Sequence, residues 1–165
     1  MKVRSLILAS MITCLGLGSA QAEDEVMMIS VKRMSMQTAQ TIANAAIEAC
    51  RKEGIQIAVT VVDRDGTEQV TLRDTIAAPI TVPISRDKAF TAVMFNAATS
   101  AMTDRAGTPI GQQPRLIMSA GGLPVEVGGA LLGGVGVSGA PSGETDEMCA
   151  QAGIDAVQDD LDMAG

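Results

Sequence analysis

The spacing of apolar residues along the chain predicts three helices. The first runs from the N-cap Ser35 to about Lys52 and stops at Gly54, because apolar residues recur there every three or four positions. The second opens at Ser85. The third covers about 144–163, with acidic residues in its first turn, where the helix dipole favours them. Between these helices lie the segments that have strand character.

Alternating and β-branched runs predict the strands, which a turn at 63–66 and later glycine-rich turns join into hairpins. The run 130–138 is the most apolar, and its glycines indicate close approach of another backbone. Hairpin-linked strands beside segregated helices predict an α+β fold, with an antiparallel sheet of about five strands flanked by helices. The strands are expected at 55–62, 68–73, 115–119, 125–127 and 130–138.

The glycines of 134–139 match the G-x-G-x-x-G pattern of dinucleotide-binding folds. That pattern requires its glycines in the turn after a strand, with a second parallel strand about 20 positions further on. Here the glycines fall within a predicted strand and only one helix follows. A dinucleotide site is therefore not expected.

The first 22 residues have the organisation of a secretory signal peptide. Two basic residues precede an apolar run that is too short to span a bilayer, and Ala20-Gln21-Ala22 supplies a cleavage site. We expect residues 1–22 to be removed, 23–34 to form an acidic and methionine-rich lead-in, and 35–165 to form a single domain. The mature protein is then periplasmic or secreted.

Charge is unevenly distributed in the mature chain. Removing Lys2 and Arg4 from the 12 basic residues leaves 10, against 19 acidic ones. Basic and acidic residues nearly balance in number up to Arg115, whereas all charged residues from Leu116 onward are acidic. An acidic protein without a basic patch is a poor partner for phosphate backbones and anionic membranes, so we expect neither nucleic acid nor a membrane as partner.

The absence of histidine, tyrosine and tryptophan excludes several kinds of site. No Ser-His or Cys-His nucleophile and no histidine–zinc centre can form within one chain. Phe90 and Phe95 are the only aromatic residues, too few for base-stacking or sugar-binding surfaces. The composition therefore favours a binding protein over an enzyme.

Two cysteines, Cys50 and Cys149, remain after removal of the signal peptide. Each lies on the apolar stripe of a predicted helix, so both could be buried as free thiols. In an exported protein they could instead form one disulfide that joins the first helix to the last. The sequence leaves both alternatives open.

Several segments in the same order resemble the GlcG/HbpS family over residues 34–161, essentially the whole mature chain. Asn96-Ala97-Ala98-Thr99-Ser100, combined with a signal peptide, is most similar to the secreted haem-binding HbpS type, whose pattern is Asn-Ala-Pro-Thr-Ser. GlcG itself and the C-terminal module of PduO corrinoid proteins are similar as well. The other matching segments are Val61-Val62-Asp63 with Gly66, Lys88-Ala89-Phe90-Thr91-Ala92, Gly121-Gly122-Leu123-Pro124-Val125, the glycines of 134–139, Asp146-Glu147 and Cys149-Ala150-Gln151-Ala152-Gly153.

The resemblance implies a profilin-like layering, a ring-like homo-oligomer such as an octamer, and binding of haem or a related tetrapyrrole, in haem or iron handling or in redox sensing. It assigns the iron ligand to Thr99. Met94 and Phe95 would then form an apolar wall, and Arg86 and Lys88 would meet the propionates. From the residue pattern alone, Met94 and Phe90 could equally be core, the two cations a solvated face, and Thr99 a helix-end hydroxyl.

Two other hypotheses stay open. A non-haem enzyme or enzyme accessory could act on a small organic acid or a corrinoid, as the GlcG and PduO relatives suggest. Against it stands the lack of any general base other than carboxylates and lysines. A purely structural oligomer is the third possibility. Haem binding is the hypothesis that the sequence favours.

Overall fold

Helices and strand hairpins alternate along the residues that the computed structural model describes, 27–164. The predicted signal peptide lies outside these residues, and all helices and strands belong to the compact unit that begins at Val31. The elements are α1 (Met36–Lys52), β1 (Ala58–Asp63), β2 (Glu68–Arg73), α2 (Thr81–Phe95), the 3-10 helix η1 (Thr99–Arg105), β3 (Gly122–Val127), β4 (Ala130–Ser138) and α3 (Gly143–Ala164).

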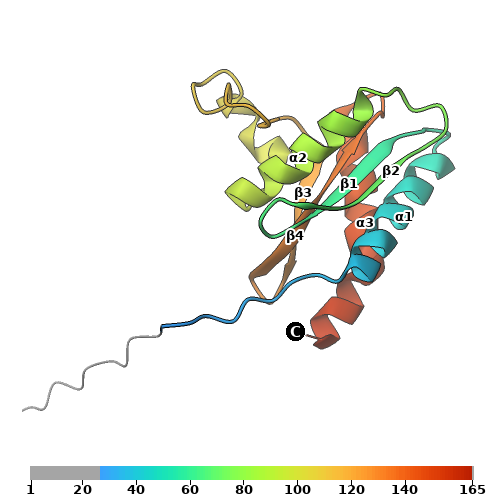
Figure 1. Ribbon diagram of the computed structural model, residues 1–165. Coiled ribbons are helices and arrows are strands. Elements are labelled where there is room, and N and C mark those ends of the chain that lie inside the picture. The colour runs from blue at the N-terminus through green and yellow to red at the C-terminus, as the bar shows by residue number, and fades with distance from the viewer. Residues whose placement is uncertain (1–26, 165) are drawn as a thin grey trace, which may run out of the picture. The chain divides into compact units, whose positions relative to one another are not determined.

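The strands form one antiparallel sheet in the order β2-β1-β4-β3, with α2 on one face and α1 and α3 on the other (Figure 1). This confirms the predicted α+β fold, although the described residues form four strands instead of about five. The segment 115–119 is a loop. Arg115 has a left-handed φ of 69°, which an extended strand does not accommodate, and the Ile117 amide donates to the Thr91 hydroxyl (2.9 Å) and not to a strand.

Strand β4 has two different faces because its glycines and valines alternate. Val135 and Val137 belong to the main core with α1 and α3, whereas Gly134 and Gly136 face α2. A Cβ atom added at Gly136 would lie 2.0 Å from the carbonyl oxygen of Ser85. The backbones of α2 and β4 are therefore in direct contact, as the glycines of this strand predict.

Helices α1 and α3 pack on each other and on the valine face of the sheet. Helix α1 begins as predicted, since Ser35 Oγ accepts a hydrogen bond from the Thr38 amide (3.1 Å). A Cβ atom at Gly153 would lie 2.7 Å from the Ile42 carbonyl oxygen, so α3 crosses α1 closely. Of the two alternatives for the cysteines, the structure has the disulfide, with Cα atoms 5.6 Å apart.

Helix α2 begins at Thr81, four residues before the predicted start at Ser85. Pro83 lies in the first turn, where its missing N–H removes no helical hydrogen bond. Ser85 is buried within the helix and donates to the Val82 carbonyl oxygen (2.9 Å), and its Oγ lies 2.9 Å from Thr60 Oγ1 of β1. The serine thus attaches α2 to the sheet instead of capping the helix.

Reduction of the disulfide between Cys50 and Cys149 should lower the free energy of unfolding. The bond joins residues 99 positions apart, and a loop of that size corresponds to up to about 4.7 kcal/mol in the chain-entropy model. Thermal unfolding with and without reductant, followed by circular dichroism, measures the loss. The control is the double variant Cys50→Ala/Cys149→Ala. Its melting temperature should be close to that of the reduced protein and should not change when reductant is added. Two thiols titrating in the unfolded, unreduced protein would contradict the disulfide.

Candidate functional site

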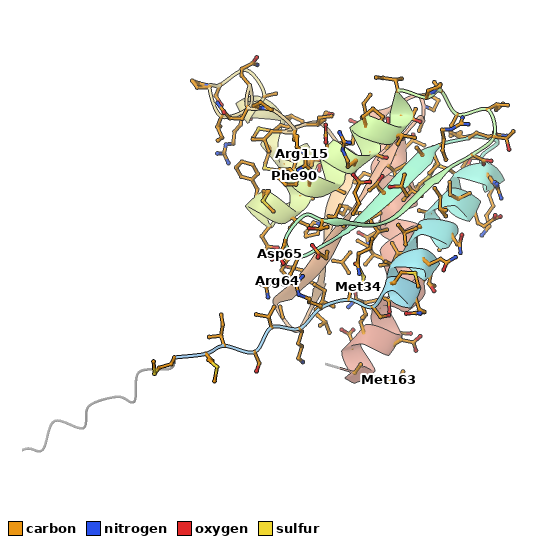
Figure 2. All side chains as sticks on the ribbon, in the orientation of Figure 1. Met34, Arg64, Asp65, Phe90, Arg115 and Met163 are labelled. Carbon is orange, nitrogen blue, oxygen red and sulfur yellow. A yellow bond between two sulfur atoms is a disulfide. The ribbon has the colours of Figure 1, made fainter. Side chains whose placement is uncertain are left out.

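An open cleft of about 540 Å³ lies between the β1–β2 turn, helix α2 and Arg115. Figure 2 shows Phe90 on α2 with Arg115 next to it, and Asp65 on the turn. Small-molecule sites commonly have volumes of roughly 300–1,000 Å³, so the cleft is large enough for an organic ligand. Its lining residues are Asp65, Gly66, Thr67, Glu68, Arg86, Phe90 and Arg115.

Asp63 fixes the turn that forms one wall of the cleft. Its Oδ1 accepts hydrogen bonds from the amides of Asp65 and Thr67, both at 2.9 Å. Gly66 has a φ of 78°, which favours glycine. A Cβ atom there would lie 2.6 Å from Cδ2 of Phe90, so the aromatic ring packs directly on the backbone of the turn.

Arg115 brings a guanidinium group to the same ring. Its Cζ lies 3.9 Å from the ring centroid of Phe90, which is a cation–π contact. The backbone next to it is attached to α2 through Thr91, whose Oγ1 accepts from the Ile117 amide (2.9 Å) and donates to the Asp87 carbonyl oxygen (2.7 Å). Phe90 and Arg115 therefore form one unit at the cleft.

The carboxylate of Asp87 lies next to both guanidinium groups of the cleft. Arg86 Nε donates to Asp87 Oδ1 (3.0 Å) and lies 3.8 Å from Glu68 Oε1, while Arg115 Nε lies 3.6 Å from the same Asp87 oxygen. The hydrogen bond to Asp87 raises the pKa of Arg86 above its ordinary value. Two permanent cations thus lie where an anionic group of a ligand could pair with them.

Lys88, predicted to meet the propionates, is buried on the sheet side of α2. Its Nζ donates to Asp146 Oδ2 (2.8 Å) and to the Val137 carbonyl oxygen (3.0 Å). Asp146 Oδ1 accepts from the Ala140 amide (2.9 Å). Burial raises the pKa of the Asp146 carboxyl, against the opposing hydrogen bonds from Lys88 and Ala140. The lysine joins α2 to α3 and does not line the cleft.

Thr99, the predicted iron ligand, is fully buried at the start of η1. Its Oγ1 accepts a hydrogen bond from the Gly122 amide (2.9 Å) and donates to the Gly122 carbonyl oxygen (3.3 Å). In this structure the hydroxyl joins η1 to β3, and Thr99 does not line the cleft.

The other two predicted residues lie at different places on α2. Met94 is 44% exposed, and its methyl group lies beside Phe90 close to Gly66, at the edge of the cleft. Phe95 packs instead under Arg105, whose Cζ lies 5.0 Å from the ring centroid. Of the five predicted binding residues, Arg86 alone lines the cleft.

Sequence reasoning did not identify Phe90 and Arg115 as site residues. The helical spacing of Phe90 indicates a core position, but the residue is only partly buried and its ring packs on the turn at Gly66. Arg115 directly follows a loop rich in glycine and proline, and is the last basic residue of the chain. Such loops often position binding residues, which is the signal that could have identified it.

Two negative findings apply to residues 27–164. No group of three or more His, Cys, Asp or Glu side chains in this range could hold a metal ion. None of the helices within it is long and apolar enough to cross a membrane.

Comparison with known proteins identifies the family. The model of a family described as "Haem degrading protein HbpS-like" matches residues 34–155. The chain belongs to this family. A double mutant of HbpS from Streptomyces reticuli has 37% sequence identity and a TM-score of 0.76, covering 85% of this chain and 97% of that one. A crystal structure of a PduOC–haem complex has 30% identity and a TM-score of 0.70, covering 76% of this chain and 95% of that one.

Relatives known by sequence confirm the predicted resemblance. The GlcG protein of Escherichia coli (strain K12) is 34% identical over 108 residues, which are 64% of this chain and 81% of GlcG. The corrinoid adenosyltransferase PduO of Salmonella typhimurium (strain LT2) is 30% identical over 131 residues, which are 75% of this chain. The match spans only 39% of the length of PduO.

The substitution Lys88→Met should destabilise the fold by about 3–5 kcal/mol, because it leaves the carboxylate of Asp146 buried without its cation. Urea denaturation measures the loss. The double variant Lys88→Met/Asp146→Asn removes both charges and keeps an acceptor for the Ala140 amide, so it should recover part of the stability. A loss below about 1 kcal/mol in the single variant would mean that the pair behaves like a surface salt bridge.

Proposed function

We propose that the mature protein is exported and binds haem or a related tetrapyrrole in the cleft beside Phe90. The observation that carries the proposal is the presence of one aromatic ring and two guanidinium groups, from Arg86 and Arg115, in a single open cleft. A planar macrocycle could stack on the guanidinium of Arg115, which lies on the Phe90 ring, and its propionates could pair with arginines. The complex of the relative PduOC with haem supports the same class of ligand.

Few side chains of this protein could ligate a haem iron. It has no histidine or tyrosine, and Cys50 and Cys149 are bonded to each other. Bound haem would supply a redox-active iron. The family resemblance assigns its ligand to Thr99, but Thr99 does not line this cleft, so ligation by Thr99 requires haem to reach beyond the cleft. Ligation there requires the hydroxyl to give up its hydrogen bonds to Gly122. Within the lining of the cleft, the Thr67 hydroxyl is the uncharged side-chain oxygen that could ligate iron, and the methyl group of Met94 lies close to Gly66.

Export and assembly are part of the same proposal. Export is supported by the signal-peptide organisation of residues 1–22 and by the disulfide, which is typical of an oxidising compartment. A ring-like homo-oligomer, such as an octamer, is what the family resemblance implies. Exposed apolar side chains on the loop between β2 and α2 suit a subunit contact, since Ile76 is 79% and Ile80 63% exposed.

Titration of the tag-free protein with haemin tests the ligand. We expect a saturable Soret band of ferric, largely high-spin haem, because an oxygen ligand exerts a weak field whereas Met or Lys ligation favours low spin. If Thr99 ligates the iron, Thr99→Ala changes the spectrum and Thr99→Ser preserves it. An unchanged spectrum in Thr99→Ala would remove this residue from the iron site.

The thermal stability of both Thr99 variants has to be measured together with their spectra. Thr99→Ala leaves the Gly122 amide without its partner, at a cost of about 1–3 kcal/mol, whereas Thr99→Ser keeps the hydroxyl. Melting curves of both variants therefore separate a folding effect from a loss of ligation. Absence of any Soret shift in the wild type would overturn the proposal and leave the enzyme-accessory hypothesis, in which the two arginines bind a small organic acid or corrinoid.

Native mass spectrometry of the protein from its own host tests export and assembly together. We expect subunits that begin at Glu23, and assemblies several times the mass of one subunit. Spraying from denaturing solution, before and after reduction, gives the subunit mass as a control. A subunit that retains Met1 would contradict processing, and a monomer at micromolar concentration would contradict assembly.

A further inference from the structure

Arg115 has a backbone conformation that disfavours its own residue type. Within residues 27–164, Arg115 and Asn96 are the non-glycine residues with positive φ, at 69° and 47°. Asparagine tolerates this region and here ends α2, whereas arginine gains nothing from it locally. Backbone strain at a residue that lines a cleft indicates that the position of its side chain has a function.

Contacts on the C-terminal side impose this conformation. The Leu116 amide donates to the Gln113 carbonyl oxygen (3.2 Å), and the Ile117 amide donates to the hydroxyl of Thr91, which is fully buried. With these contacts made, the guanidinium of Arg115 lies on the ring of Phe90. The Arg115 side chain is still 45% exposed, so part of it remains free to contact a ligand.

We infer that Arg115 and Arg86 determine specificity by recognising the carboxylates and the flat conjugated surface of the ligand, and that a central metal contributes little to affinity. This inference rests on the proposed function and deepens it. The lining of the cleft contains no His, Cys, Met, Tyr or Lys side chain that would bind iron strongly. Of its two carboxylates, Asp65 is paired with Arg33 and Glu68 lies 3.8 Å from Arg86, so neither is unpaired for a metal. Arginine, in contrast, both stacks on conjugated systems and pairs with carboxylates in a fixed geometry.

Acidic side chains set the competition that such a ligand meets, and Asp87 is the nearest of them, 3.0 Å from Arg86 Nε and 3.6 Å from Arg115 Nε. Asp65 is paired with Arg33, which lies outside the cleft. Glu68 lies 3.8 Å from Arg86 and is exposed, so it competes with a ligand carboxylate for that guanidinium. Removing the charge of Glu68 should therefore strengthen binding of an anionic ligand.

The test compares three ligands on the tag-free, full mature protein: haemin, iron-free protoporphyrin IX and haemin dimethyl ester. Absorbance reports binding of all three, and porphyrin fluorescence adds a second signal for the iron-free compound. We expect protoporphyrin IX to bind within about threefold of haemin. The ester should bind about tenfold more weakly or worse, because it lacks the charge-assisted hydrogen bonds.

Substitutions at the cleft show which side chains determine the affinity for the ligand. Arg115→Asn suits the left-handed backbone but removes stacking and charge, so it should weaken binding of protoporphyrin IX about tenfold, and Arg115→Lys should lose less. Arg86→Gln should act in the same direction, whereas Glu68→Gln should strengthen binding about two- to fivefold. The matched control is Arg105→Asn, because Arg105 also stacks on a phenylalanine but lies outside the cleft. Melting curves identify any variant that fails to fold.

The outcomes separate the two proposals. If haemin binds but protoporphyrin IX does not, or if Arg115→Asn binds like the wild type, the inference is wrong and haem binding stands. If none of the three ligands binds the wild-type protein, the proposed function itself is wrong. Equal binding of haemin and its dimethyl ester would also overturn the inference, since the carboxylates would then contribute nothing.

Discussion

Direct contact between α2 and the glycine face of β4 is the constraint on which the site depends. Gly134 and Gly136 present no side chain, so the sheet side of α2, at Ser85 and Ala89, lies against the backbone of the strand. Arg86 directly follows Ser85, and Phe90 directly follows Ala89. Arg86 and Phe90 are thus also four residues apart, and both line the cleft. Because residues four apart share a helix face, the position of α2 on the sheet determines where both side chains lie.

Two polar residues that were predicted to contact the ligand, Lys88 and Thr99, serve the fold in this structure. Lys88 and Asp146 join α2 to α3 across the end of β4, and Thr99 joins η1 to β3 through Gly122. All three side chains are buried, and each makes hydrogen bonds within the protein because a buried polar group cannot make them with water. Arg86 and Arg115 are instead partly exposed, and they pair with Asp87 and Glu68 at the cleft.

Local pattern was enough for most of the fold. Apolar periodicity predicts α1 and α3, Ser35 predicts the start of α1, and the glycines of β4 predict that this strand contacts another backbone. The site was harder to predict than the fold, because it is formed by residues that are distant in sequence. Nothing near Arg115 indicates that Thr91 holds its loop, and nothing near Lys88 indicates a partner 58 positions away. A lysine at a helix start normally faces water, so its burial depends on tertiary packing that spacing does not encode.

The disulfide links α1 to α3 on one face of the sheet, and α2 on the other face contains no cysteine that could form one. The two faces therefore differ in their cross-links. Displacing α3 from α1 is opposed by a disulfide as well as by packing, whereas α2 is retained on the sheet by packing, by hydrogen bonds and by the ion pair between Lys88 and Asp146. Reduction would therefore act on the layer opposite the cleft, because the contacts that position Arg86 and Phe90 include no bond that a reductant could break.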